Sequence, residues 1–243
     1  NQILSVTASD LGKATPPTTW ESFPLGEYQL VTLPIKPLDK DHKAALGLTA
    51  PGSTIARWDP AARQYVYYGD PALELFEPGK GFWIRFGTGE SFAASPIPGE
   101  LQTEKFKVFL NPGWHLIGDP FHTNSEGTLL FDHLTFHYGD TTKPHSFIEA
   151  VIDGYVGFGL WGFSNGNYKL EREKLHAWQG YWIYVKRGCE LQFWPTNPYL
   201  SMSTFNIAWE AQLTVSQSGT SDNANYFGMA RSVSAGADNF DAE

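Results

Sequence analysis

Short stretches in which hydrophobic and polar residues alternate recur along the chain. In the segment 207–215 the odd positions are apolar and the even positions are mostly polar, which is the period of a half-buried β-strand. The segment 105–110 alternates in a similar way, and the segment 65–68 is rich in residues that favour strands. This pattern predicts a mainly β fold built from short strands.

Capping and turn signals add two short helices and a hairpin. Ser146 and Glu149 have the spacing of a capping box that starts a helix, and Gly154 ends that helix. A shorter helical turn is predicted over residues 41–46. Asn165-Gly166 predicts a two-residue hairpin loop, because both central positions of a type I′ turn need a positive φ angle.

The central part of the sequence occurs twice. The matching segments are Tyr28 to Ile35 with Trp114 to Phe121, Trp58 and Tyr65 with Trp161 and Tyr168, and Gly81 to Ile84 with Gly180 to Ile183. We therefore expect two tandem homologous modules, β-sandwich-like or barrel-like, with a short crossover helix in the second. The sequence leaves open whether they share one sheet system or form two domains.

The expected organisation has four parts. They are an N-terminal strand with a proline-rich loop (residues 1–27), β repeat one (28–96), β repeat two (97–196) and an incomplete C-terminal segment of β-sandwich strands (197–243). The start of the chain at Asn1, without an initiator Met, suggests a piece of a longer polypeptide.

Composition narrows the partners and the compartment. The chain of 243 residues has a formal net charge of −9, which disfavours nucleic acid and anionic membranes as partners. It has no stretch near the roughly 20 apolar residues that a membrane-spanning helix needs. Cys189 is the only cysteine and lies in an alternating segment, so we expect a buried thiol and no internal disulfide. Abundant Trp and Gly with few charges suit a secreted or cell-surface protein.

Catalytic motifs receive little support. Gly162-Phe163-Ser164-Asn165-Gly166 matches the nucleophile elbow G-x-S-x-G, but that motif works only where a strand turns into a helix. Its flanks predict a hairpin, so we interpret the match as a coincidence. A pair of catalytic carboxylates stays open, because acidic residues are plentiful. We predict no catalytic residues.

Histidines are unevenly distributed, and all but His42 lie in repeat two or its insertion. His133 and His137 are expected on one strand face, and Asp119 and His122 lie near each other in the sequence. Imidazole and carboxylate groups suit zinc or copper, but no typical ligand spacing is present. We therefore predict neither a metal site nor a cofactor, and keep a metal site as an alternative.

Aromatic residues are the remaining binding candidates, because flat rings stack on the apolar faces of sugars. Large aromatic residues that occur in both repeats are expected to form the core of each module. Trp178 and Trp194 instead replace Gly79 and Ser95, so we expect them at the surface, against the neighbouring module or on a ligand. The candidate ligand-binding residues are Trp178, Trp194, Tyr67 and Tyr155.

Two parts of the chain carry a resemblance. The run G-W-x-L-I-G-x-P-F at 113–121, with P-G-K-G-F-W-I at 78–84, resembles a tandem β-rich repeat of non-catalytic regions in secreted and cell-surface bacterial proteins. Some of those proteins carry glycoside hydrolase domains. The pattern beyond residue 203 is similar to the opening of immunoglobulin-like surface modules. The resemblance implies a fold and an extracellular setting, and no catalytic residue.

Three functional hypotheses follow. The leading one is an extracellular, non-catalytic module that binds polysaccharide by stacking sugars on exposed aromatic side chains. The alternative is a structural or assembly module of a cell-surface, surface-layer-like or filament protein, with another surface protein as its partner. The third is a metal-dependent enzyme that uses the histidines of repeat two.

Overall fold

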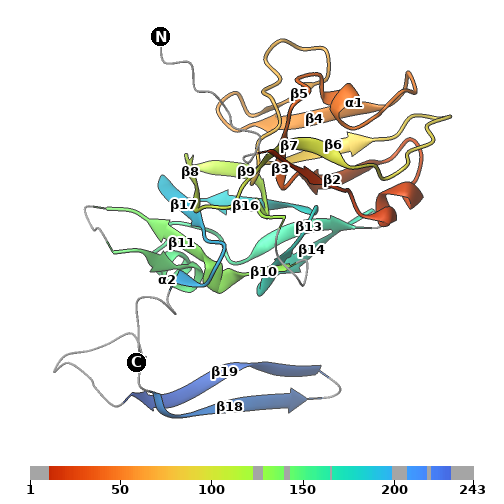
Figure 1. The fold of residues 1–243 in the computed structure, drawn as a ribbon. Coiled ribbons are helices and arrows are strands. Elements are labelled where there is room, and N and C mark those ends of the chain that lie inside the picture. Colours follow the sequence, from red (N-terminus) through yellow and green to blue (C-terminus); the bar gives the residue numbers. More distant parts are fainter. Residues whose placement is uncertain are drawn as a thin grey trace. The chain divides into compact units, whose positions relative to one another are not determined.

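The computed structural model confirms a mainly β fold (Figure 1). It describes residues 11–122, 128–139, 143–164, 166–198, 207–217 and 220–230, with the last two segments described as backbone. The chain divides into two compact units, Asn1–Asn197 and Pro198–Glu243. The strand expected at residues 3–7 lies outside the described residues.

Two four-stranded antiparallel sheets in the first unit have the same strand order. One sheet has the order β2-β6-β4-β5 and the other β9-β16-β13-β14, so the two repeats arrange corresponding segments in the same way. The strands are β2 (Tyr28–Thr32), β4 (Thr54–Asp59), β5 (Gln64–Tyr67), β6 (Gly81–Arg85), β9 (Gly113–Gly118), β13 (Leu160–Ser164), β14 (Asn167–Glu171) and β16 (Gly180–Val185).

Each repeat contains a second sheet, with the order β1-β7-β3 in repeat one and β12-β11-β17-β8 in repeat two. The strands are β1 (Leu11–Ala14), β3 (Ile35–Pro37), β7 (Ile97–Leu101), β8 (Phe106–Leu110), β11 (Leu134–His137), β12 (His145–Ser146) and β17 (Cys189–Phe193). A separate two-stranded ladder joins β10 (Thr128–Leu130) to β15 (Lys174–His176).

The pairing of β1 with β7 changes the expected limits of repeat one. β1 lies in the part expected as an N-terminal strand and proline-rich loop, and β7 lies at the expected start of repeat two, yet both belong to this second sheet. Prolines in and beside these strands hid the pairing, because proline normally signals a loop or a sheet edge. In sheet terms, repeat one extends from β1 to β7.

The helices form as the caps predict. The helix α2 (Phe147–Ile152) has the expected capping box, in which Ser146 and Glu149 bond reciprocally. The helix α1 (His42–Ala45) is capped by Asp41, whose carboxylate accepts a 2.8 Å bond from the Ala44 N–H. The described part of the chain also contains two 3₁₀ turns, η2 (Thr18–Ser22) and η3 (Phe131–His133).

The predicted hairpin is confirmed between β13 and β14, where Ser164 pairs with Asn167. Gly166 has the expected positive φ of 74°, and Asn165 lies outside the described residues. Ser164 therefore ends a strand of an antiparallel hairpin. The G-x-S-x-G match does not occupy the strand-to-helix turn that a nucleophile elbow requires.

The strand register corrects one detail of the repeat alignment. Tyr65 is paired with Trp58, whereas Tyr168 is paired with Phe163. The structural counterpart of Trp58 is therefore Phe163, and Trp161 lies two residues earlier in its strand. The sequence match aligned Trp58 with Trp161 because both lie seven residues before a tyrosine. The loop at 60–63 is longer than the loop at 165–166, so equal spacing in sequence is not equal position in the hairpin.

Strand alternation separates the two faces of each four-stranded sheet. Phe82 and Ile84 point into the core of repeat one, and Tyr181 and Ile183 point into the core of repeat two. Cys189 belongs to the second core, where burial raises the pKa of its thiol to about 11. The expectation of a buried thiol is confirmed.

The opposite faces of the two sheets pack against each other along what we call the seam. Its core consists of Leu30, Ala56 and Trp83 from repeat one with Leu116 and Trp182 from repeat two. These residues alternate along their strands with those that fill the two repeat cores. The central strands β6 and β16 are therefore buried on both faces, once within their repeat and once at the seam.

Reciprocal backbone contacts fix the two repeats in register. The Thr32 N–H donates to the Trp178 carbonyl at 3.1 Å, and the Gly118 N–H donates to the Gly79 carbonyl at 3.1 Å. Thr32 corresponds to Gly118, and Gly79 corresponds to Trp178. Such exchanged contacts are those of an approximate two-fold axis between the repeats.

The second unit contains an antiparallel pair of long strands. β18 (Ile207–Gln217) pairs with β19 (Thr220–Ala230), with two irregularities in the register. The strand predicted over 207–215 is confirmed.

Close backbone approach at the seam predicts different costs for two equivalent glycines. A Cβ on Gly180 would lie 2.7 Å from the Val31 carbonyl oxygen, whereas one on Gly81 would lie 3.1 Å from the Ile117 carbonyl oxygen. We expect Gly180→Ala to lower the free energy of unfolding by about 1–3 kcal/mol, and Gly81→Ala to lower it by less. Urea denaturation measures both losses. Equal losses in the two variants, or a larger loss in Gly81→Ala, would contradict the seam geometry.

Candidate ligand-binding grooves

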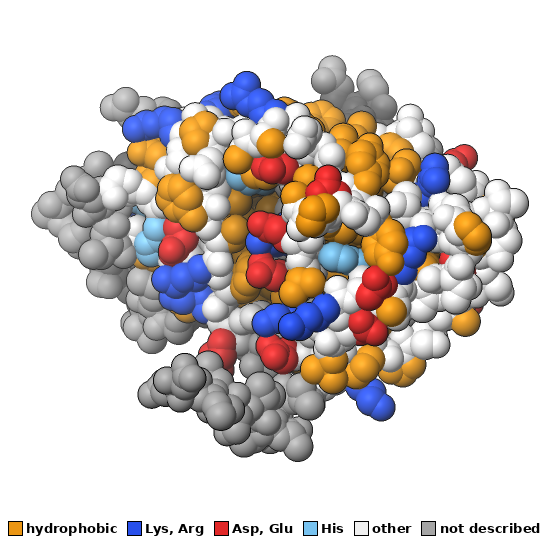
Figure 2. Space-filling view, turned by 90° about the horizontal axis from the view of Figure 1, so that it is seen from above, with side chains coloured by type: hydrophobic (Ala, Val, Ile, Leu, Met, Phe, Trp, Pro, Cys, Tyr) orange, Lys and Arg blue, Asp and Glu red, His pale blue; other side chains and the backbone are white. Residues whose placement is uncertain are grey.

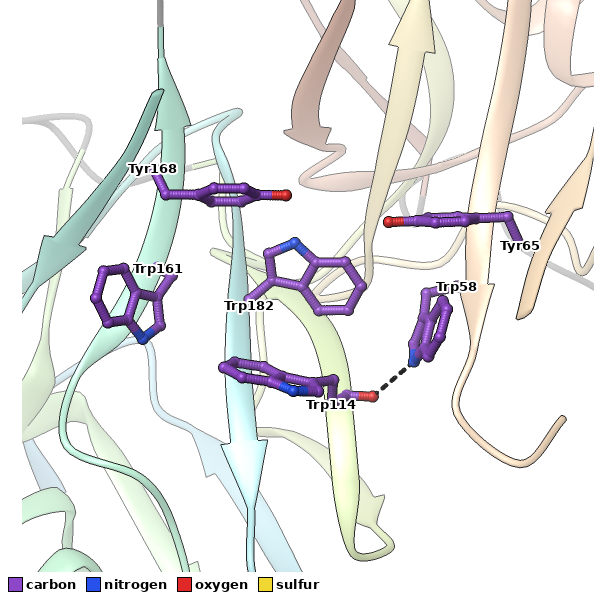
Figure 3. Close-up of a pocket in the computed structure, with 6 residues that line it drawn as sticks. All are labelled: Trp58, Tyr65, Trp114, Trp161, Tyr168 and Trp182. Carbon is purple, nitrogen blue, oxygen red and sulfur yellow. Dashed lines mark hydrogen bonds between the residues drawn. The ribbon is translucent and has the colours of Figure 1, made fainter. Parts of the chain in front are cut away.

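An open cavity of about 550 Å³ lies at the seam and is lined by aromatic side chains from both repeats. We call it the first groove. Figure 3 shows its six lining residues, which are Trp58, Tyr65, Trp114, Trp161, Tyr168 and Trp182.

The strands place these rings on the seam side of their sheets. Trp114 lies two residues before Leu116 on β9, and Trp58 lies two residues after Ala56 on β4. Since side chains two apart share a face, both rings continue the buried seam core outward. Trp182 belongs to that core and also lines the groove. The first groove is thus the exposed end of the packing that joins the repeats.

The walls of the first groove stand nearly at right angles. The rings of Trp58 and Trp182 meet at 75° with centroids 5.7 Å apart, and those of Trp114 and Trp182 meet at 82° with centroids 6.1 Å apart. The Trp58 Nε1–H donates to the Trp114 carbonyl at 2.9 Å across the seam. In Figure 3 Tyr65 and Tyr168 lie on the other side of Trp182 from Trp114, with their hydroxyls directed toward each other. The indole orientations are therefore fixed by ring contacts and by one hydrogen bond.

A smaller cavity of about 290 Å³ adjoins the same pair of tyrosines, and we call it the second groove. Its lining residues are Tyr28, Ala56, Tyr65, Tyr67, Trp83, Phe163 and Tyr168. Tyr65 and Tyr168 line both grooves, so the two phenols stand at the boundary between them.

The grooves carry polar atoms but no charge. Among the described residues that line them none is acidic or basic, and the polar side-chain atoms are phenol hydroxyls and indole N–H groups. Burial raises the pKa of Tyr65 above its usual range, and the neighbouring Tyr168 raises it further by a smaller amount. Acidic and basic side chains are interspersed on the face shown in Figure 2. The grooves therefore suit a neutral ligand with apolar faces and hydroxyl groups at its edges.

Trp178 does not lie in either groove. It is only 7% exposed and packs at 5.6 Å, ring edge to ring face, on Trp20 in the core of repeat one. Its φ of 66° matches the 76° of Gly79, so both residues occupy a left-handed turn that normally favours glycine. Of the placements we considered, packing against the neighbouring module is the one observed, and it leaves little of the indole surface exposed.

Trp194 and Tyr155 also lie outside the grooves. Trp194 is half-buried, donates from Nε1 to the Thr135 hydroxyl at 2.9 Å, and lies under the Lys105 ammonium group. Tyr155 is stacked on Tyr138 with centroids 3.8 Å apart and is also approached by Arg187. The rings of both residues already have partners within the protein.

Tyr67 is the one residue of the predicted set that reaches a groove. It is 49% exposed and lines the second groove beside Tyr65.

Most groove residues are shared aromatics that we assigned to the module cores. That assignment is correct for Phe82 and Tyr181, which are buried in the two repeat cores. It is wrong for Trp161, which is 38% exposed, and for Tyr168, which is 52% exposed. The signal that distinguishes them is alternation, since Phe82 and its neighbour Trp83 must point to opposite faces of one sheet.

The histidines are distributed over separate surroundings. His115 is buried and bonds from Nε2 to the Asn111 carbonyl at 2.7 Å, and burial lowers its pKa. His133 ends the η3 turn and bonds to the Trp194 carbonyl, whereas His137 ends β11. The two therefore do not share a strand face, as we had expected. Within the described part of the chain no three His, Cys, Asp or Glu residues are grouped as metal ligands would be.

In comparisons with protein-family models, curated proteins and solved structures, nothing matches this chain significantly. None of the helices in the described ranges is long and apolar enough to cross a membrane.

Asp119 is a buried acid outside the grooves, at the position that Leu33 holds in repeat one. Its Oδ1 accepts a 2.9 Å bond from the Phe121 N–H, and its Oδ2 has no partner among the described residues. Burial raises its pKa from 3.8 to about 7, although the Phe121 bond opposes the shift. Between these values the unfolded chain loses the proton first, so the stability of the native state falls as the pH rises.

We expect Asp119→Asn to remove this pH dependence. The free energy of unfolding of the unsubstituted chain should fall by up to about 4 kcal/mol more than that of the variant when the pH is raised from 4 to 8. Urea denaturation at the two pH values tests this, with exposed Glu104→Gln as a control that should leave the pH dependence unchanged. An equal pH dependence in Asp119→Asn would show that Asp119 ionises normally.

Proposed function

We propose that the first unit is an extracellular, non-catalytic module that binds carbohydrate in the first groove. The observation that carries the proposal is a groove lined by six aromatic side chains from two repeats, with no charged group among them. Exposed aromatic clusters of this kind mark interaction sites, because leaving so many rings exposed to water does not stabilise the fold.

The binding mode follows from the ring geometry. A sugar ring has an apolar face, which would stack on the Trp114 indole or on the phenol rings of Tyr65 and Tyr168 opposite it. Hydroxyl groups at the sugar edge would bond to the two phenols. Trp58 and Trp182 are held by each other and by the seam, so little conformational entropy is lost when a ligand binds.

A non-catalytic role fits the lining of the grooves. Glycoside hydrolysis needs two carboxyl groups on opposite sides of the scissile bond. No Asp or Glu is found among the described residues that line either groove. We further propose that each repeat is a small β-sandwich, and that the protein acts outside the cell.

A structural or assembly role is the second candidate, and the C-terminal unit favours it. β18 and β19 each have 11 residues and pair with no third strand in the described backbone. A two-stranded ribbon is marginally stable alone, and its edges are suited to pairing with a strand of another protein. Such assembly is compatible with carbohydrate binding by the first unit.

Loss of one groove wall should weaken binding. We expect Trp161→Ala to lower the affinity for the bound polysaccharide at least about tenfold, which is about 1.4 kcal/mol, because a stacking surface is lost. Affinity electrophoresis against xylan, glucan, mannan and pectin identifies the ligand, and calorimetry measures the change.

Two further variants serve as controls. Phe109 is 63% exposed on β8 and lines neither groove, so Phe109→Ala should bind normally. Trp194→Ala tests the site expected from the sequence, and it should bind normally if the ligand lies in the first groove. Full affinity in Trp161→Ala, with a loss in Trp194→Ala, would contradict the first groove as the site.

A further inference from the structure

The second groove is the counterpart of the first under the approximate two-fold axis. Strand register relates Trp114 to Tyr28, Trp182 to Trp83, Trp161 to Ala56 and Trp58 to Phe163, and it exchanges Tyr65 with Tyr168. Applied to the lining of the first groove, this exchange gives six of the seven residues that line the second groove. Tyr67 is the seventh.

Ring contacts repeat with the same geometry. Trp58 meets Trp182 at 75° and 5.7 Å, and Phe163 meets Trp83 at 74° and 5.1 Å. Trp58 meets Tyr65 at 69° and 5.2 Å, and its counterpart Phe163 meets Tyr168 at 66° and 5.1 Å. Two related aromatic walls therefore stand on either side of the phenol pair.

We propose that the two grooves are halves of one extended site, which binds a linear oligosaccharide long enough to cross the Tyr65–Tyr168 pair. This inference rests on carbohydrate binding as the function. The shared phenols join the cavities, so one chain can enter both without leaving the aromatic surface. Their facing hydroxyls lie where the middle of that chain would pass.

The two grooves differ in size and lining, so we expect them to contribute unequally to the affinity for the ligand. The first groove has indoles at three positions where the second has Ala56, Tyr28 and Phe163, and its volume is about 550 Å³ against about 290 Å³. Larger aromatic faces bury more sugar surface. The first groove is therefore the anchor for short ligands, and the second adds affinity when the chain is long enough.

The length of the ligand is the test. Tryptophan fluorescence titrations would use linear β-1,4-linked gluco-, xylo- and manno-oligosaccharides of increasing length. Because a second contact on one chain acts at high effective concentration, affinity should rise at least about 100-fold over a narrow range of lengths. Calorimetry should then give one long chain per protein molecule.

Variants separate the two halves. Tyr67→Ala removes an exposed wall of the second groove, so it should lower affinity for long chains about tenfold and affect short chains less. Trp161→Ala should lower the affinity for oligosaccharides of every length, and Phe109→Ala should leave the affinity unchanged at every length.

Each outcome bears on a different claim. Binding that does not strengthen with length, or equal losses for short and long chains in Tyr67→Ala, would overturn the joined site and leave carbohydrate binding standing. Two long chains per protein would also overturn it. Failure of every oligosaccharide and every polysaccharide to bind would contradict the proposed function itself, and this inference with it.

Discussion

The exchanged hydrogen bonds between the repeats are the constraint on which the first unit depends. Thr32 bonds to the Trp178 carbonyl and Gly118 to the Gly79 carbonyl, so the end of β2 and the end of β9 each bond to the turn that leads into a strand of the other sheet. Gly180 allows the approach, since a Cβ there would meet the Val31 carbonyl. Without this close register the aromatic residues of the two sheets would not share a groove.

Strand alternation turns that register into a binding surface. Along the strands β6 and β16, alternate residues fill a repeat core, and Trp83 and Trp182 between them face the other repeat. Toward one side of the seam the seam-facing residues are Leu30, Ala56 and Leu116, which are buried. Toward the other side the seam-facing residues include larger rings, such as Trp161 and Tyr168. The sheets leave these rings exposed, and the space between them is the first groove. Packing of the repeats and formation of the site thus have the same origin.

Local signals allowed much of the fold to be predicted. The capping box of Ser146 and the Asn-Gly hairpin depend on residues a few positions apart, and the structure contains both. The site was not predicted, because it depends on which face of each sheet meets the other repeat. Trp178 illustrates the limit. Its replacement of a glycine left open the surface, the neighbouring module and a ligand, and in the structure the neighbouring repeat supplies a core for the indole.

In the proposed function, residues of both repeats form one aromatic site. Two-dimensional NMR of the tryptophan indole N–H groups tests it directly, with each signal assigned by a single Trp substitution and followed during titration with the polysaccharide that binds. We expect the signals of Trp58, from repeat one, and of Trp161 and Trp182, from repeat two, to shift together, while those of buried Trp20 and Trp178 stay unchanged. Shifts confined to one repeat, or to Trp194, would contradict it.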